Sequence, residues 1–175
     1  MTKKYVLTGS AWSGKTSVID ALAKHKFVTV PEAATFIISE QLANGGNLLP
    51  WTNLDEFLEV LIEKQLALEA QIPAGSEIAF IDRGIPDELA YYKYRGVAPT
   101  PRYEKAFEEY RYDTIVFLLE TLPEYRQDKI RREPPEMVQR LRFLHEEAYT
   151  ELGYNVTIVP VLPVEERVKF VLERI

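Results

Sequence analysis

One eight-residue segment with two glycines constrains this chain more than any other feature. It follows the apolar run Tyr5–Leu7, precedes a helical pattern over Ser17–Ala23, and fits the pattern G-x-x-x-x-G-K-T. Glycine lets the backbone turn tightly and approach oxygen atoms closely, and the amides of such a loop converge on phosphate at the N-terminus of the next helix. The segment therefore predicts a binding site for a nucleoside di- or triphosphate. The residues expected to form it are Gly9, Ser10, Ala11, Trp12, Ser13, Gly14, Lys15, Thr16 and Ser17.

Two side chains of this loop have distinct expected roles. Lys15 is expected to reach the β- and γ-phosphates and to act in catalysis, and the Thr16 hydroxyl is expected to ligate Mg²⁺. The alternative is a glycine turn that only caps a helix. The strand–loop–helix context favours the phosphate-binding reading.

The rest of the chain alternates strands with helices. We expect strands over residues 5–7, 27–30, 78–81, 114–119 and 156–159, and helices beginning near residues 17, 32, 54, 87, 103, 137 and 163. Strands that alternate with helices favour a parallel sheet covered on both sides. The pattern thus predicts one α/β domain over residues 1–175, with a five-stranded parallel sheet flanked by helices on both faces.

Composition excludes several classes of function. The chain has 175 residues, a net charge of −6 and no cysteine. Without cysteine there is no disulfide, thiolate zinc site or cysteine nucleophile. The acidic balance argues against broad nucleic-acid binding. No apolar signal region or run of about 18 apolar residues is present, so we expect a cytoplasmic enzyme with no membrane span.

Polar residues that directly follow a strand are candidates for the site, because ligands bind at the carboxyl ends of parallel strands. Asp82 follows the expected strand 78–81 and would help to hold Mg²⁺ opposite Thr16. Arg83 comes next and would lie close to the phosphates. The alternative for this segment is a helix cap with a surface ion pair.

Glu32 follows the second expected strand. A carboxylate there would face the acceptor side of the γ-phosphate and could take the proton of an attacking hydroxyl. It could equally be a glutamate favoured at a helix N-terminus by the helix dipole. The residues alone leave both readings open.

A charged segment lies between the fourth strand and the next helix, at about residues 121–135. Cations on a short, arginine-rich lid would close over the triphosphate and stabilise transition-state charge. The alternative is an ordinary solvated charged face. The candidate catalytic arginines are Arg126, Arg131 and Arg132.

The remaining conspicuous side chains have no assigned role. His25 and His145 lack metal-ligand spacing. Trp12, Trp51 and Tyr91 lie in segments that could border a pocket, but simple packing is the favoured interpretation for them.

Taken in order, these segments resemble a known group of proteins. The chain is similar to small P-loop ATPase or kinase domains of the AAA type, related to NadR-type nicotinamide riboside kinases. The resemblance implies a nucleoside-kinase-like core, with Glu32 and Asp82–Arg83 on the acceptor and metal side, an arginine lid, and a loop at 159–163 near the nucleotide base. The segments that carry it are residues 9–16, 30–35, 81–84 with Asp87 and 90–91, 132–133, 152–154, 159–160 and 165–168.

These observations favour an ATP-dependent phosphotransferase that uses Mg²⁺ and moves the γ-phosphate to a hydroxyl of a small, nucleoside-like acceptor. A nucleotide-gated binding protein, using ATP or GTP with little acceptor chemistry, is the alternative from another class. A plain NTPase is the third possibility. No N-K-x-D sequence is present, which argues against a Ras-like GTPase but leaves GTP possible as the nucleotide.

Overall fold

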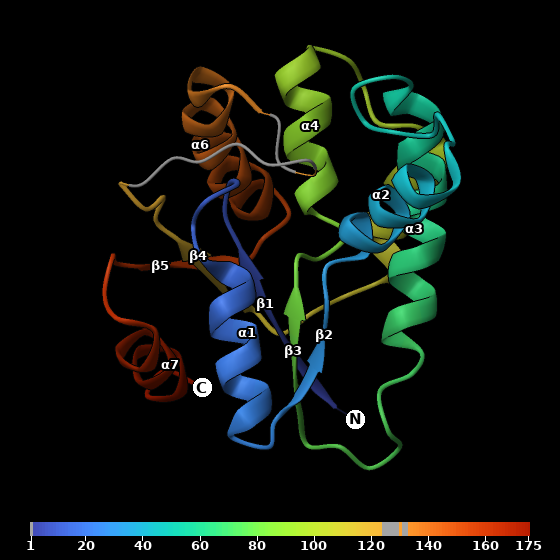
Figure 1. Ribbon diagram of the computed structural model, residues 1–175. Helices are drawn as coiled ribbons and strands as arrows, with labels where there is room; N and C mark the ends of the chain where they lie inside the picture. The colour runs from blue at the N-terminus through green and yellow to red at the C-terminus, as the bar shows by residue number, and fades with distance from the viewer. Residues whose placement is uncertain (1, 124–129, 131–132) are drawn as a thin grey trace.

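Five parallel strands form the central sheet of the computed structural model, which describes residues 2–123, 130 and 133–175 (Figure 1). Their order across the sheet is β2-β3-β1-β4-β5. All strands run the same way, so their carboxyl ends lie at one edge. The strands are β1 (Lys3–Thr8), β2 (Val28–Val30), β3 (Ile78–Asp82), β4 (Ile115–Leu119) and β5 (Asn155–Val159).

The central strand β1 is buried on both faces, as its nearly continuous apolar sequence predicts. Val6 is in register with Ile81 of β3 and with Val116 of β4. Successive side chains of a strand point to opposite faces. Tyr5 and Leu7 accordingly pack into one buried cluster, and Val6 packs into another.

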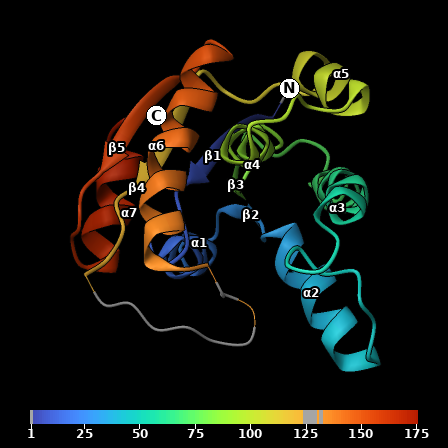
Figure 2. The ribbon, with the colours of Figure 1, turned by 90° about the horizontal axis from the view of Figure 1, so that it is seen from above.

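Helices cover both faces of this sheet. On one face α1 (Lys15–Lys24) and α7 (Val164–Leu172) lie side by side over Tyr5 and Leu7 (Figures 1 and 2). On the other face α6 (Pro135–Glu151) packs against Val6 through Tyr149 and contacts α4 (Asp87–Arg95).

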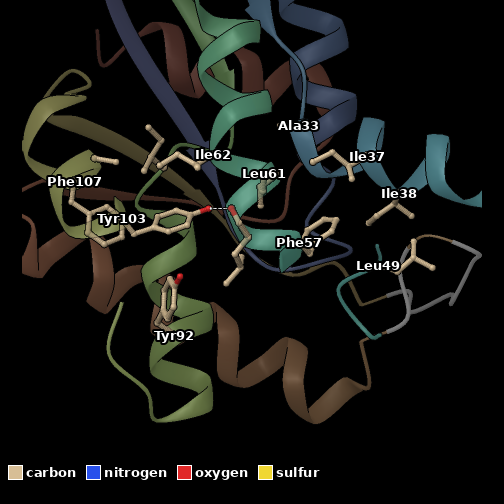
Figure 3. Packing of buried hydrophobic residues seen from close by; sticks show 13 residues of the cluster. Ala33, Ile37, Ile38, Leu49, Phe57, Leu61, Ile62, Tyr92, Tyr103 and Phe107 are labelled. Carbon is tan, nitrogen blue, oxygen red and sulfur yellow. Dashed lines mark hydrogen bonds between the residues drawn. The ribbon is translucent and has the colours of Figure 1, made fainter. Parts of the chain in front are cut away.

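The remaining helices build a second layer of core beside the sheet. They are α2 (Ala33–Asn44), α3 (Leu54–Glu69) and α5 (Pro101–Glu109), and they pack with α4 around a large apolar cluster (Figure 3). The Tyr103 hydroxyl donates a hydrogen bond of 2.7 Å to the carbonyl of Leu58, which ties α5 to α3 in the middle of the cluster. This cluster fixes α2 and α3 as a firm wall beside the carboxyl ends of β2 and β3.

The predicted fold class is confirmed. Each expected strand and helix is present, with boundaries that differ by a few residues. The lid predicted at about 121–135 includes residues 124–129 and 131–132, so Arg126, Arg131 and Arg132 lie outside the described residues. In the part of the chain that the structure describes, no helix is both long and apolar enough to cross a membrane.

Candidate active site

The loop between β1 and α1 has the backbone that its glycines predict. Gly9 has a φ of 137°, and a Cβ on it would lie 2.6 Å from the carbonyl oxygen of Leu119. No side chain fits in that space, so this position requires glycine. Trp12 also adopts a left-handed φ, of 58°.

Lys15 is the first residue of α1 and lies back over the loop. Its ammonium group donates hydrogen bonds to the carbonyls of Gly9 (2.8 Å) and Ser10 (3.0 Å) and to the Ser13 hydroxyl (3.1 Å). Burial, together with the positive charge of Arg83, lowers the pKa of Lys15 to about 8. An anion in the loop would reverse this effect, because an opposite charge favours the ammonium form.

Thr16 and Asp82 meet as predicted. The Thr16 hydroxyl donates to Asp82 Oδ2 over 3.4 Å, and Asp82 is 1% exposed. Burial and the nearby Glu32 raise the pKa of Asp82 to about 7. Its other oxygen, Oδ1, is buried and has no hydrogen-bond partner among the described residues.

This pair has the chemistry of a magnesium site at a phosphate loop. Mg²⁺ at such sites takes one or two protein oxygens and completes its octahedron with water and phosphate oxygens. In the described part of the chain, no group of three or more His, Cys, Asp or Glu side chains gathers to hold a metal by itself. One hydroxyl beside one carboxylate with a free oxygen therefore fits Mg²⁺ bound together with a nucleotide.

Glu32 lies across the cavity from the loop and is held by two side chains. One carboxylate oxygen accepts a hydrogen bond from Arg83 Nε (2.7 Å), and the other accepts one from the Thr35 hydroxyl (2.8 Å). Burial alone would raise the pKa of Glu32, but Arg83 and Lys15 outweigh it and lower the pKa to about 2. The side chain makes no hydrogen bond to the amides of α2, so it does not cap that helix.

Arg83 is fixed by carboxylates on two sides. Its φ of 67° is left-handed, and its Nη1 donates a hydrogen bond of 2.8 Å to Asp87, four residues later at the start of α4. The Arg83 side chain is only 12% exposed, so its pair with Asp87 is not the surface ion pair that the sequence also allowed. Arg83 lines the cavity beside the loop, with its charge matched by Glu32 and Asp87.

Asp87 is a buried residue that connects several side chains of the site, and its sequence context predicted no role for it. It is fully buried and accepts hydrogen bonds from the Thr8 hydroxyl (2.7 Å), the Tyr149 hydroxyl (2.5 Å) and the Gly84 amide (3.1 Å). The electrostatic interactions with His145 and Arg83 and the bonds from Tyr149 and Thr8 oppose the effect of burial and lower the pKa of Asp87. The four-residue spacing of the opposite charges Arg83 and Asp87, just after a strand, is the signal that could have identified it.

His145 also belongs to this network, although its sequence context gave it no role. It is fully buried on α6, with Nε2 3.3 Å from Arg83 Nη1 and 3.4 Å from Asp87 Oδ1. Burial lowers its pKa to about 4. A neutral imidazole can therefore accept a hydrogen bond from Arg83 near neutral pH.

A cavity of about 510 Å³ joins the loop to this network. Residues 11–17 form one wall, while Gly9 and Ser10 lie below it against the end of β4. Glu32, Thr35, Arg83, Glu88 and Tyr91 supply polar groups on the opposite side. The α2–α3 wall is apolar and aromatic, and its members are Ile38, Trp51, Leu54, Phe57, Leu58 and Leu61.

Glu88 is a second carboxyl group that lines the cavity with Glu32, and no pattern in the sequence indicated it. It is 8% exposed, and among the described residues its side chain makes no hydrogen bond or ion pair. Burial and the charge of Asp87 raise its pKa to about 8. A carboxyl group of this kind, open to a cavity and without a protein partner, is suited to a ligand that offers hydrogen-bond donors.

Comparisons with known proteins bear on the family and the fold of the chain. A family model described as an AAA domain matches residues 4–167. No curated protein matches the chain. The matching solved structures include three kinds of protein whose identity to this chain is low enough that they show the fold alone.

The NadR protein in complex with NR superposes with a TM-score of 0.74 at 18% identity, over 98% of this chain and 49% of that one. The chain thus spans about half the length of that protein. Thymidylate kinase from Ehrlichia chaffeensis has a TM-score of 0.67 at 15% identity, over 98% and 97% of the two chains. Deoxyadenosine kinase from M. mycoides with bound dATP has a TM-score of 0.67 at 15% identity, over 98% of each chain.

Proposed function

The chain belongs to the AAA domain family, and from that premise we propose that it is an ATP-dependent kinase of a small hydroxyl compound. One observation carries the proposal: a single cavity is lined both by residues 11–17 of the glycine loop and by the Glu32 carboxylate, which Arg83 holds. This arrangement brings a donor phosphate and an acceptor hydroxyl together. Phosphoryl transfer needs mainly positioning and charge neutralisation, and these residues supply both.

On the donor side, the amides of residues 9–16 and the Lys15 ammonium bind the phosphates. Thr16 and Asp82 would hold Mg²⁺, which when bound neutralises charge on the β- and γ-phosphates. The proposal also includes three arginines of the expected lid as further cations that stabilise charge in the transition state: Arg126, Arg131 and Arg132. GTP remains a possible donor in place of ATP.

On the acceptor side, Glu32 accepts a hydrogen bond from the attacking hydroxyl. Transfer breaks the bond from the γ-phosphorus to the donor's bridging oxygen, forms one to the acceptor oxygen, and moves the hydroxyl proton to Glu32. Because its pKa is lowered to about 2, Glu32 is charged near neutral pH and a weak base. It therefore acts first by orienting the hydroxyl and takes the proton only as the new bond forms.

The charges of the cavity favour an acceptor without a phosphate group. Among the described residues that line it, the cations are Lys15, which faces the loop, and Arg83, which is paired with two carboxylates. The charged Glu32 would repel an anionic acceptor, and Glu88, whose pKa is raised to about 8, offers such an acceptor no positive charge. The apolar wall suits a flat ring, so we expect a nucleoside-like acceptor, as in the NadR complex with NR, rather than the nucleotide acceptor of a thymidylate kinase.

A panel of acceptors tests this proposal. With MgATP, ADP production should depend on nucleosides that carry a primary hydroxyl and should not respond to their 5′-monophosphates. Lys15→Ala should abolish most of the activity, while Lys24→Ala, an exposed lysine of the same helix, should leave it unchanged. Activity with monophosphates alone would contradict the acceptor class.

Other outcomes distinguish the alternatives. An unchanged rate in Lys15→Ala would contradict the kinase itself. ATP binding without consumption in the presence of any acceptor would favour a nucleotide-gated binding protein. ATP hydrolysis that no acceptor stimulates would favour a plain NTPase.

A further inference from the structure

Arg167, on α7, contacts the glycine loop and is not among the residues that line the cavity. Its Nη1 donates a hydrogen bond of 2.8 Å to the Ser13 carbonyl, and its Nε donates one of 2.7 Å to the Leu162 carbonyl. The guanidinium also lies against Gly14, where a Cβ would come within 3.0 Å of Nη1. One side chain therefore joins the loop after β1 to the segment that follows β5.

No acidic side chain in the described part of the chain matches the charge of this arginine. Arg167 is 5% exposed, and among the described residues no carboxylate forms an ion pair with it. Burial lowers the pKa of its guanidinium, and no neighbouring charge opposes that effect. Other arginines of the chain with little exposure, Arg83 and Arg142, each contact two acidic side chains.

A buried cation without a counter-charge is costly to the folded protein, since it gives up its hydration for two neutral carbonyl oxygens. An anion bound close to the guanidinium would supply the missing counter-charge and offset this cost. The loop that it contacts, residues 9–16, is the proposed phosphate site. The positive potential of Arg167 adds there to that of Lys15 and the N-terminus of α1.

We propose that Arg167 is a positioning residue of the donor site, which holds the Ser13–Gly14 peptide in its phosphate-binding conformation and supplies unpaired positive charge for the phosphates. This inference rests on the donor half of the proposed function and not on the acceptor. The ligand class it recognises is a polyphosphate, whatever base is attached. Arg167 acts through the loop backbone and needs no direct contact with the nucleotide.

Binding of ATP and of inorganic tripolyphosphate, measured by calorimetry on the full chain, tests the proposal. Arg167→Met should weaken both ligands by the same factor, about tenfold, because the loop loses its support at Ser13 and a nearby positive charge. Arg167→Lys keeps the charge but cannot reach both carbonyls, so its affinity should fall between the other two proteins. Arg174→Met, an exposed arginine just beyond the same helix, should bind like the wild type.

The melting temperature without ligand separates this role from a structural one. It should stay the same or rise in Arg167→Met, because an unmatched buried charge is removed. Unchanged affinity for both ligands in that variant overturns the proposal. So does a lower unliganded melting temperature accompanied by no rescue in Arg167→Lys.

The outcome is independent of the acceptor. A wild-type protein that binds ATP but phosphorylates nothing contradicts the proposed kinase, yet the Arg167 comparison still decides this inference. A wild-type protein that binds neither ATP nor tripolyphosphate contradicts both.

Discussion

Asp87 shows how one residue can hold two halves of a site together. Its carboxylate joins Thr8, at the end of β1, to Arg83, at the end of β3, and Arg83 in turn holds Glu32 at the start of α2. Breaking a buried ion pair leaves its partner charge uncompensated, which costs far more than losing an exposed pair. Asp87 should therefore matter for stability as much as for transfer.

We expect Asp87→Ala to lower the free energy of unfolding by about 3–5 kcal/mol, since it removes one of the two carboxylates that match the buried Arg83 charge and leaves the Tyr149 hydroxyl without its acceptor. Urea unfolding measures this difference. Asp55→Ala provides the control, because Asp55 also pairs with an arginine, Arg95, but is 74% exposed. Removing the exposed Asp55 should lower the free energy of unfolding far less than removing Asp87. Equal losses of unfolding free energy in the two variants would contradict the importance of Asp87 for stability.

Glu88 predicts a dependence of stability on pH. Its pKa is raised from an ordinary 4.5 to about 8, so between these values the unfolded chain releases a proton that the folded protein keeps. The contribution to stability is complete below pH 4.5 and is lost as the pH rises towards 8. Asp82, with a pKa raised to about 7, adds a slope of the same sign.

Glu88→Gln should remove its share of this slope. Between pH 5 and pH 9 the variant should therefore lose less free energy of unfolding than the wild type, by an amount on the order of 2 kcal/mol. Urea unfolding at three pH values gives the comparison. Glu104→Gln, an exposed glutamate of α5, should keep the wild-type slope. Parallel slopes for the wild type and Glu88→Gln would argue against a buried, protonated Glu88.

At the scale of elements, the turn from β3 to α4 places most of the site chemistry within six residues. Asp82 ends the strand, Arg83 turns in a left-handed conformation, and Asp87 begins the helix. Gly84 lies between them under two rings: a Cβ there would lie 2.9 Å from the Tyr112 ring and 3.0 Å from the Tyr149 hydroxyl. The turn can thus shift only if α6 or its neighbours shift too.

Gly84→Ala should destabilise the protein by about 1–3 kcal/mol through overpacking, and it should also lower kcat because Arg83 is displaced. Gly96→Ala is the matched control at the other end of α4. Gly96 has a φ of 67° but open space around it, so we expect a cost of about 1 kcal/mol and no change in kcat. Stability and kcat measured on both variants separate crowding at the site from backbone strain alone. A normal kcat in Gly84→Ala would show that this turn tolerates movement.

The sequence predicts the elements well because their signals are local. Strand and helix periodicity, the loop at 9–16 and the position of Asp82 just after a strand all depend on neighbouring residues. Thr16 and Asp82 could be placed together because they follow strands of one parallel sheet. The Asp87–Tyr149 contact spans 62 residues, and it depends on how α4 packs on α6. His145 had no local signal at all, since only that packing brings it to Arg83.

At the scale of the whole molecule, nucleotide binding should stabilise the fold, because the loop residues belong to the folded state alone. With MgATP at about 100 times its Kd, the expected gain of about 2.7 kcal/mol corresponds to a rise in melting temperature of roughly 5–10 °C for a domain of this size. Thermal unfolding with and without MgATP measures the rise. The rise in melting temperature should be small in Lys15→Ala and should equal that of the wild type in Lys24→Ala. A full shift in Lys15→Ala would place the nucleotide elsewhere.

The position of β1 at the centre of the sheet has a consequence for how the protein is made. Both of its neighbours come later in the chain, β3 about 75 residues on and β4 more than 100 residues on. During synthesis the first strand therefore has no partner until β3 has left the ribosome, and it is paired on both sides only after β4 has followed. We expect cotranslational folding to begin among α2, α3 and the helices beside them, whose contacts are close in sequence, and the phosphate-binding half to assemble last.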